Sequence, residues 1–135
     1  MMEIQGSCLC GAIRYAVRLP FDKFLYCHCS RCRKTTGTPH ASNAIVAPDA
    51  LRWLAGQQNV QRYDLPTARS FSSAFCKTCG APMPRLTRSG KRVIVPAGSL
   101  DSDPDEKPAC HAHWASRAGW YSDDPALPKF DGDAF

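Results

Sequence analysis

Three cysteines in a Cys-x-Cys-x-x-Cys array, Cys27, Cys29 and Cys32, are the residues of this chain best suited to metal chemistry. Thiolates are preferred ligands of Zn²⁺, which takes four ligands in a tetrahedron. Three ligands from one short segment leave the fourth position for water, a substrate or a residue from elsewhere in the chain. We therefore expect these cysteines to hold a zinc ion with an open position, and we take them as the candidate catalytic residues.

The fourth position of this site has several candidates. A histidine or the remaining cysteine could fill it and make a second closed site: His28, Cys110, His111 or His113. His28 fits least well, because it lies between two ligands and its ring should point away from them. Another interpretation makes one cysteine a nucleophile with His28 or His111 as its base. A lone nucleophile would not explain three cysteines at ligand spacing.

Four further cysteines form two pairs, Cys8 with Cys10 and Cys76 with Cys79. Together they supply the full ligand set of a closed structural zinc, so we expect two zinc ions per chain. Disulfides are the alternative, but residues 1–6 have neither the basic start nor the apolar core of a signal peptide. We therefore expect reduced thiols and a cytoplasmic location.

Length and charge narrow the class of protein. The 135 residues fit a single small domain over residues 1–135, and no window is apolar enough for a membrane helix. The net charge of +5 comes from scattered basic residues, so nucleic acid is an unlikely partner. The densest basic segment, Arg31, Arg33 and Lys34, could instead bind the carboxylate of a small molecule, or simply balance thiolate charge.

Eleven prolines and the scarcity of long amphipathic segments predict a mainly β fold with few short helices. One or two helical turns are expected at 30–36, with Ser30 as the N-cap and Gly37 as the end. Cys110 should be a small buried residue, and His111 and His113 could share one strand face. The expected strands cover residues 12–17, 24–26, 41–47, 51–54, 61–65, 70–75 and 92–98.

With these features placed, the sequence resembles the glutathione-dependent formaldehyde-activating enzyme family, also called the centromere protein V domain family. The resemblance covers nearly the whole chain. Its segments are GSCLCG at 6–11, CHCSRCRKTTG at 27–37, FCKTCG at 75–80 and PACH at 108–111, followed by Trp120 and LPKF at 127–130.

The resemblance implies a small zinc-binding β-sheet domain of the Mss4-like type. It implies a structural zinc at the four paired cysteines and a second zinc at the three-cysteine array, in agreement with the spacing argument. It also implies a carbon-sulfur lyase-type reaction in which glutathione, or a similar small thiol, adds to formaldehyde or a related aldehyde to give S-(hydroxymethyl)glutathione. The alternative is a non-catalytic zinc module that binds a protein or a nucleic acid.

Overall fold

The computed structural model describes residues 2–135. This part of the chain forms ten strands, one α-helix and four short 3-10 helices. The strands are β1 (Glu3–Ser7), β2 (Arg14–Arg18), β3 (Lys23–Cys27), β4 (Ala41–Val46), β5 (Leu51–Ala55), β6 (Val60–Asp64), β7 (Ser72–Cys76), β8 (Arg85–Leu86), β9 (Val93–Pro96) and β10 (Cys110–Ala112). The helices are α1 (Ser30–Thr36), η1 (Pro48–Ala50), η2 (Gln57–Asn59), η3 (Ala97–Ser99) and η4 (Trp114–Ser116). The predicted mainly β fold is confirmed, and no helix in residues 2–135 is long and apolar enough to cross a membrane.

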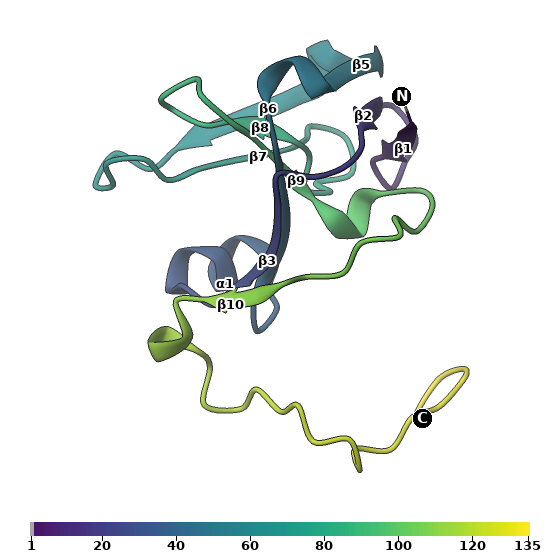
Figure 1. Cartoon of the computed structure of the whole chain (residues 1–135), viewed down its shortest axis with the longest axis vertical. Helices are drawn as coiled ribbons and strands as arrows, with labels where there is room; N and C mark the ends of the chain where they lie inside the picture. Colours follow the sequence, from purple (N-terminus) through teal and green to yellow (C-terminus); the bar gives the residue numbers. More distant parts are fainter. Residues whose placement is uncertain (1) are drawn as a thin grey trace.

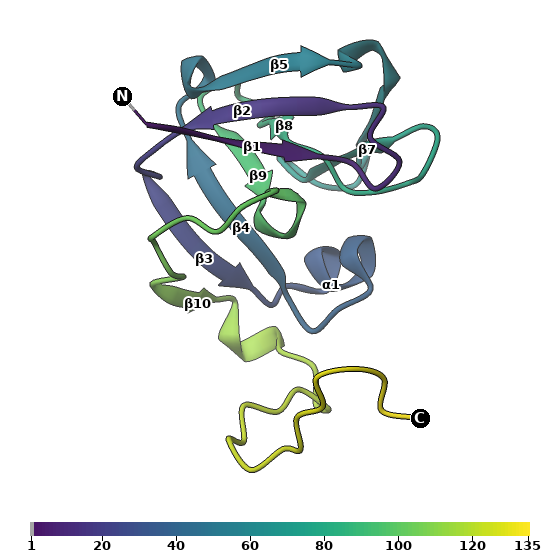
Figure 2. The same ribbon diagram turned by 90° about the vertical axis from the view of Figure 1, so that its right-hand side faces the viewer.

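The strands of residues 2–135 are arranged in three sheets, which Figures 1 and 2 show from two sides. One sheet has the order β1-β2-β5, a second has the order β10-β3-β4-β9-β8, and β6 pairs with β7. The pairings are antiparallel except that β10 runs parallel to β3. Helix α1 follows soon after the end of β3, so the three-cysteine array lies where a strand of the five-stranded sheet ends (Figure 2).

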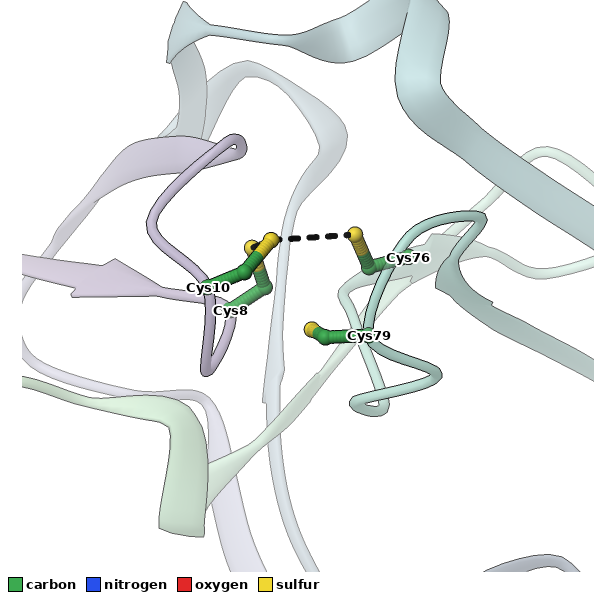
Figure 3. A group of neighbouring side chains, drawn as sticks. All are labelled: Cys8, Cys10, Cys76 and Cys79. Atoms are coloured by element: carbon green, nitrogen blue, oxygen red, sulfur yellow. Dashed lines mark hydrogen bonds between the residues drawn. The ribbon is translucent and has the colours of Figure 1, made fainter.

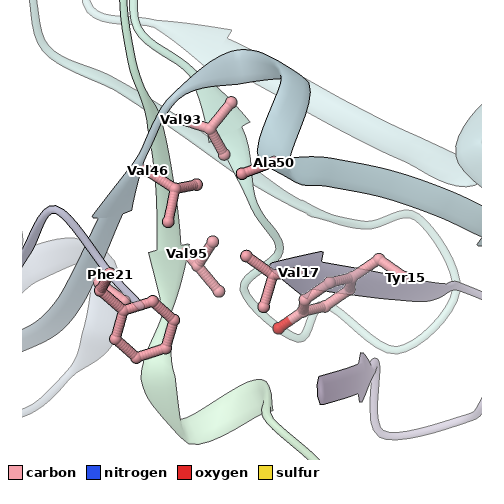
Figure 4. Close-up of a cluster of buried hydrophobic side chains, with 8 residues drawn as sticks. Tyr15, Val17, Phe21, Val46, Ala50, Val93 and Val95 are labelled. Carbon is pink, nitrogen blue, oxygen red and sulfur yellow. The ribbon is translucent and has the colours of Figure 1, made fainter. Parts of the chain in front are cut away.

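The main apolar core lies between the first two sheets (Figure 4). Tyr15 and Val17 project from β2, Val46 projects from β4, and Val93 and Val95 project from β9. All five are at most 3% exposed. Residues two apart on a strand face the same side, so the spacing in β2 and β9 places both members of each pair in the core. This packing makes β4 a rigid support for the neighbouring strand β3, which delivers the cysteines.

Sequence periodicity located most of the strands, with ends that differ by one or two residues from those observed. Three observed strands, β1, β8 and β10, are not among the expected ranges, although a strand face at His111 and His113 was suggested near β10. β1 has the sequence EIQGS, in which only one large apolar residue and a glycine interrupt a polar run. β8 is only two residues long and exists because it pairs with β9. Neither segment carries the alternation from which a strand is predicted.

We predict that Gly6→Ala destabilises the fold by about 1–3 kcal/mol, the usual cost of overpacking a core. A Cβ at Gly6 would overlap the ring of Tyr15, which is fully buried and whose hydroxyl is hydrogen-bonded to Ser99. Urea denaturation would measure the loss. The matched control is Gly98→Ala, where the new methyl group meets open space. Equal stabilities for the two variants would contradict the prediction.

Candidate metal centres

Two cysteine pairs far apart in the sequence meet at one point (Figure 3). Cys8 and Cys10 lie in the turn after β1, Cys76 ends β7, and Cys79 lies in the turn that follows. The four sulfur atoms are within 4.8 Å of one another. The Sγ atoms of Cys8 and Cys10 are 3.6 Å apart, and those of Cys10 and Cys76 are 3.9 Å apart. Tetrahedral zinc with bonds of about 2.3 Å requires about 3.8 Å between sulfurs, so this group fits the ion.

The two turns that carry these cysteines each depend on a glycine. Gly11 has φ +81° and donates its N–H to the carbonyl of Cys8, and Gly80 has φ +77° and donates to the carbonyl of Cys76. Glycine adopts this left-handed conformation without the steric cost that a side chain imposes. The side-chain amide of Asn59 also donates to the Cys76 sulfur at 3.3 Å, a contact that the sequence did not indicate.

The three-cysteine group is built around the start of α1. Cys27 is the last residue of β3, Cys29 precedes the helix, and Cys32 lies in its first turn. The sulfur atoms of these three residues are within 4.8 Å of one another. The expected helix is confirmed, and it ends at Gly37 as predicted, with φ +68°.

Ser30 was expected to cap this helix, and that expectation was wrong. The cap is Cys29, whose backbone is extended and whose Sγ accepts the N–H of Cys32 at 3.3 Å. The physical reason is that the cap must precede the first helical residue, and here the helix already begins at Ser30. A candidate metal ligand therefore also caps the start of the helix.

The three-cysteine group borders a cavity of about 650 Å³. This volume is in the range of small-molecule sites. Other parts of its lining come from the β8 region, from the segment before β7 and from His113. The residues that line this cavity include Cys27, Cys29, Cys32, Phe71, Arg85 and His113.

Hydrogen bonding within the three-cysteine group gives its thiols different pKa values. The bond with the Cys32 thiol lowers the pKa of Cys27 to about 5, and the Cys29 backbone and the charge of His113 act in the same direction. The same bond, together with burial, raises the pKa of Cys32. One thiolate is therefore present at neutral pH, and it is a ready first ligand for a cation.

The thiols of the four-cysteine group also differ in pKa. The backbone N–H of Cys79 is the largest influence on Cys76 and lowers its pKa to about 6. A backbone hydrogen bond at Ala12 lowers the pKa of Cys10, but burial and hydrogen bonds from neighbouring thiols outweigh it and raise the value to about 11. Each group thus combines a thiol that ionises easily with one that keeps its proton at neutral pH.

The histidines are divided between two places. The His28 ring is fully buried and points away from the cysteines, as expected, with Nε2 at 2.8 Å from Nδ1 of His111. His113 follows β10 with φ +55° and lines the cysteine cavity. The suggestion that His111 and His113 share a strand face was wrong, because the left-handed residue lies beyond the strand's end and breaks its alternation.

Two further expectations need correction. Cys110 is exposed rather than buried, because β10 is an edge strand of three residues with β3 as its neighbour. Of the basic segment, Arg31 borders the cysteine cavity, whereas Arg33 and Lys34 are not among its lining residues. The basic residue that sequence reasoning missed is Arg85, in the short strand β8. Nothing local in the sequence separates it from the other arginines.

We predict that binding of Zn²⁺ to the metal-free protein at pH 7 releases protons from both cysteine groups. The pKa values of Cys10 (about 11) and Cys32 (raised) keep these thiols protonated at pH 7, whereas zinc binds thiolates. Zinc affinity should therefore fall as the pH falls. Calorimetric titrations in buffers of different ionisation enthalpy would measure the released protons. Cys110→Ser should release the same number, and zinc binding without proton release would contradict the prediction.

Comparisons with known proteins show which family the chain resembles. Residues 3–116 match the family model described as glutathione-dependent formaldehyde-activating enzyme. A Halomonas elongata protein described as a putative glutathione-dependent formaldehyde-activating enzyme is 32% identical over 76% of this chain and 68% of its own length. A Schizosaccharomyces pombe protein described as an uncharacterized lyase is 29% identical over 67% of this chain, which spans only 63% of that relative.

A solved structure supports the same assignment at the level of the fold. The crystal structure of a Rhodobacter sphaeroides protein superposes with a TM-score of 0.64 at 26% identity. The superposition covers 81% of this chain and 100% of the other. Because the family model matches most of the chain's length, the chain belongs to the glutathione-dependent formaldehyde-activating enzyme family.

Proposed function

We propose that this chain is a zinc-dependent carbon-sulfur lyase-type enzyme that joins a small thiol to formaldehyde or a related aldehyde. With glutathione and formaldehyde the product is S-(hydroxymethyl)glutathione. Family membership and the names of the relatives support the general activity. The observation that carries the proposal is that the sulfurs of Cys27, Cys29 and Cys32 converge beside a cavity large enough for a small peptide.

The two cysteine groups have different roles in this proposal. Cys8, Cys10, Cys76 and Cys79 supply four ligands and would hold a structural zinc with no position left for substrate. Cys27, Cys29 and Cys32 supply three and would hold the second zinc. An ion held there supplies one chemical effect, namely a lower pKa for a thiol that occupies its fourth position.

The reaction needs no further reactant. A bond forms between the substrate sulfur and the aldehyde carbon, and the second carbon–oxygen bond of the aldehyde breaks. The electron pair of that bond moves to the oxygen, which takes the proton that the thiol lost. The task of the chain is to orient the thiol beside Cys27, Cys29 and Cys32 while the cavity admits a small aldehyde.

We predict two zinc ions per chain in the wild type and one in Cys29→Ser, with the fold of the variant retained. The three-cysteine group packs in a small cluster apart from the main core, so loss of its ion should lower the melting temperature only slightly. Cys76→Ser should be much less stable, because it breaks the link between distant turns. Elemental analysis and thermal denaturation would test both variants. Collapse of Cys29→Ser, or a single zinc in the wild type, would contradict this assignment.

We predict that the purified protein accelerates exchange between glutathione, formaldehyde and their adduct. Exchange NMR would measure the rate above the uncatalysed reaction. Cys29→Ser should reduce the acceleration at least about a hundredfold, since it removes a ligand of the proposed working ion. Cys110→Ser is the control, because this exposed cysteine lies outside both groups. If neither glutathione nor other small thiols show acceleration, the proposed catalysis is wrong.

A further inference from the structure

Arg85 lies in the wall of the cavity that contains the three-cysteine group. It is held there by β8, where it pairs with Ile94 of β9, and its side chain is only partly exposed. The guanidinium carbon is 5.9 Å from the centre of the Phe71 ring, a cation–π contact with a second cavity residue. The strand pairing with β9 and the contact with the Phe71 ring together hold the guanidinium in the cavity wall.

The charge of Arg85 has no acceptor among residues 2–135. The ion pairs in this part of the chain join Arg18 to Asp49, Arg52 to Glu3 and Arg62 to Asp64. Arg88 comes from the same region of the chain but, unlike Arg85, donates hydrogen bonds to the carbonyls of Leu65, Ala68 and Phe71. Arg88 is therefore a structural residue.

The cavity itself offers no counter-charge other than sulfur. Its lining contains hydroxyl groups, an amide, apolar side chains, arginines and a histidine, but no aspartate or glutamate among the described residues. Burial lowers the pKa of Arg85, and the nearby thiols only partly oppose this effect. A partly buried guanidinium stays charged, and leaving its donors unmatched costs free energy. The wall thus carries a cation whose only nearby opposite charge is that of the thiols.

We propose that Arg85 binds a carboxylate of the thiol substrate, so that the cavity selects thiols that carry a carboxylate over neutral thiols. The inference deepens the proposed function and rests on it for the presence of a thiol in this cavity. The planar fork of a guanidinium matches a carboxylate through two parallel hydrogen bonds. The sulfur of the same molecule then reaches Cys27, Cys29 and Cys32 across the cavity. Arg85 thus takes the role that the sequence suggested for the basic segment of α1.

The test compares two thiols of similar size, 3-mercaptopropionate with a carboxylate and 2-mercaptoethanol without one. Their dissociation constants are measured by calorimetry on the zinc-loaded wild type, on Arg85→Gln and on Arg85→Lys. Loss of a charged hydrogen-bonding partner should weaken binding of 3-mercaptopropionate to Arg85→Gln about tenfold or more. Binding of 2-mercaptoethanol should stay within about twofold, and Arg85→Lys should keep part of the preference.

Arg31→Gln is the matched control, because Arg31 borders the same cavity but is exposed. It should weaken binding of 3-mercaptopropionate less than Arg85→Gln does. Equal weakening of both thiols, together with zinc loss, would show that Arg85 merely balances the thiolates, and the proposal would be wrong. An unchanged preference in Arg85→Gln would also overturn it.

Two features keep this test independent of folding and of catalysis. If Arg85→Gln does not fold, the wild type alone must still prefer 3-mercaptopropionate, and salt must reduce that preference. A wild type that binds both thiols equally, or neither, overturns the proposal. A wild type that binds with the expected preference but does not accelerate adduct exchange would instead disprove the proposed catalysis and leave the role of Arg85 standing.

Discussion

The meeting of two distant cysteine pairs is the contact on which the rest of the structure depends. Cys8 and Cys10 belong to the turn between β1 and β2, whereas Cys76 and Cys79 belong to the end of β7. Their convergence joins the first hairpin to a strand from the middle of the chain, and Ile13 and Met83 pack around the junction. A domain of this size has a modest core, and a metal ion bound by these four cysteines would compensate for it.

The second cysteine group uses the same ligand chemistry in different surroundings. The four-cysteine group contains a complete tetrahedral set, whereas the three-cysteine group lies at a strand end beside a cavity. Local backbone geometry positions it: Cys27 is fixed by the sheet, and Cys29 and Cys32 are fixed by the start of α1. Rigid elements on both sides hold a site more accurately than a mobile loop would. The proposed difference between a structural and a catalytic role therefore rests on the number of sulfur ligands, four against three, and on the cavity beside the second group.

Charge in the cavity has a consistent pattern. The thiolate of Cys27 supplies negative charge, and the guanidinium of Arg85 supplies positive charge in the same cavity. No carboxylate among the described residues competes for the guanidinium within the cavity. A substrate with both a thiol and a carboxylate complements these two regions at once, and a neutral thiol complements only one. The fold thus provides a physical basis for discrimination among small thiols.

The sequence by itself determined which residues could be ligands, because the spacing of Cys27, Cys29 and Cys32 is a local property of one turn and one short helix. Strand positions were also local, since alternation of apolar residues reflects which face is buried. Only the tertiary structure decided the exposure of Cys110 and the cavity position of Arg85. Both depend on which strand becomes a neighbour, β3 for β10 and β9 for β8. The β10–β3 pairing joins residues far apart in the chain, and β8 is only two residues long, so no local pattern encodes either pairing.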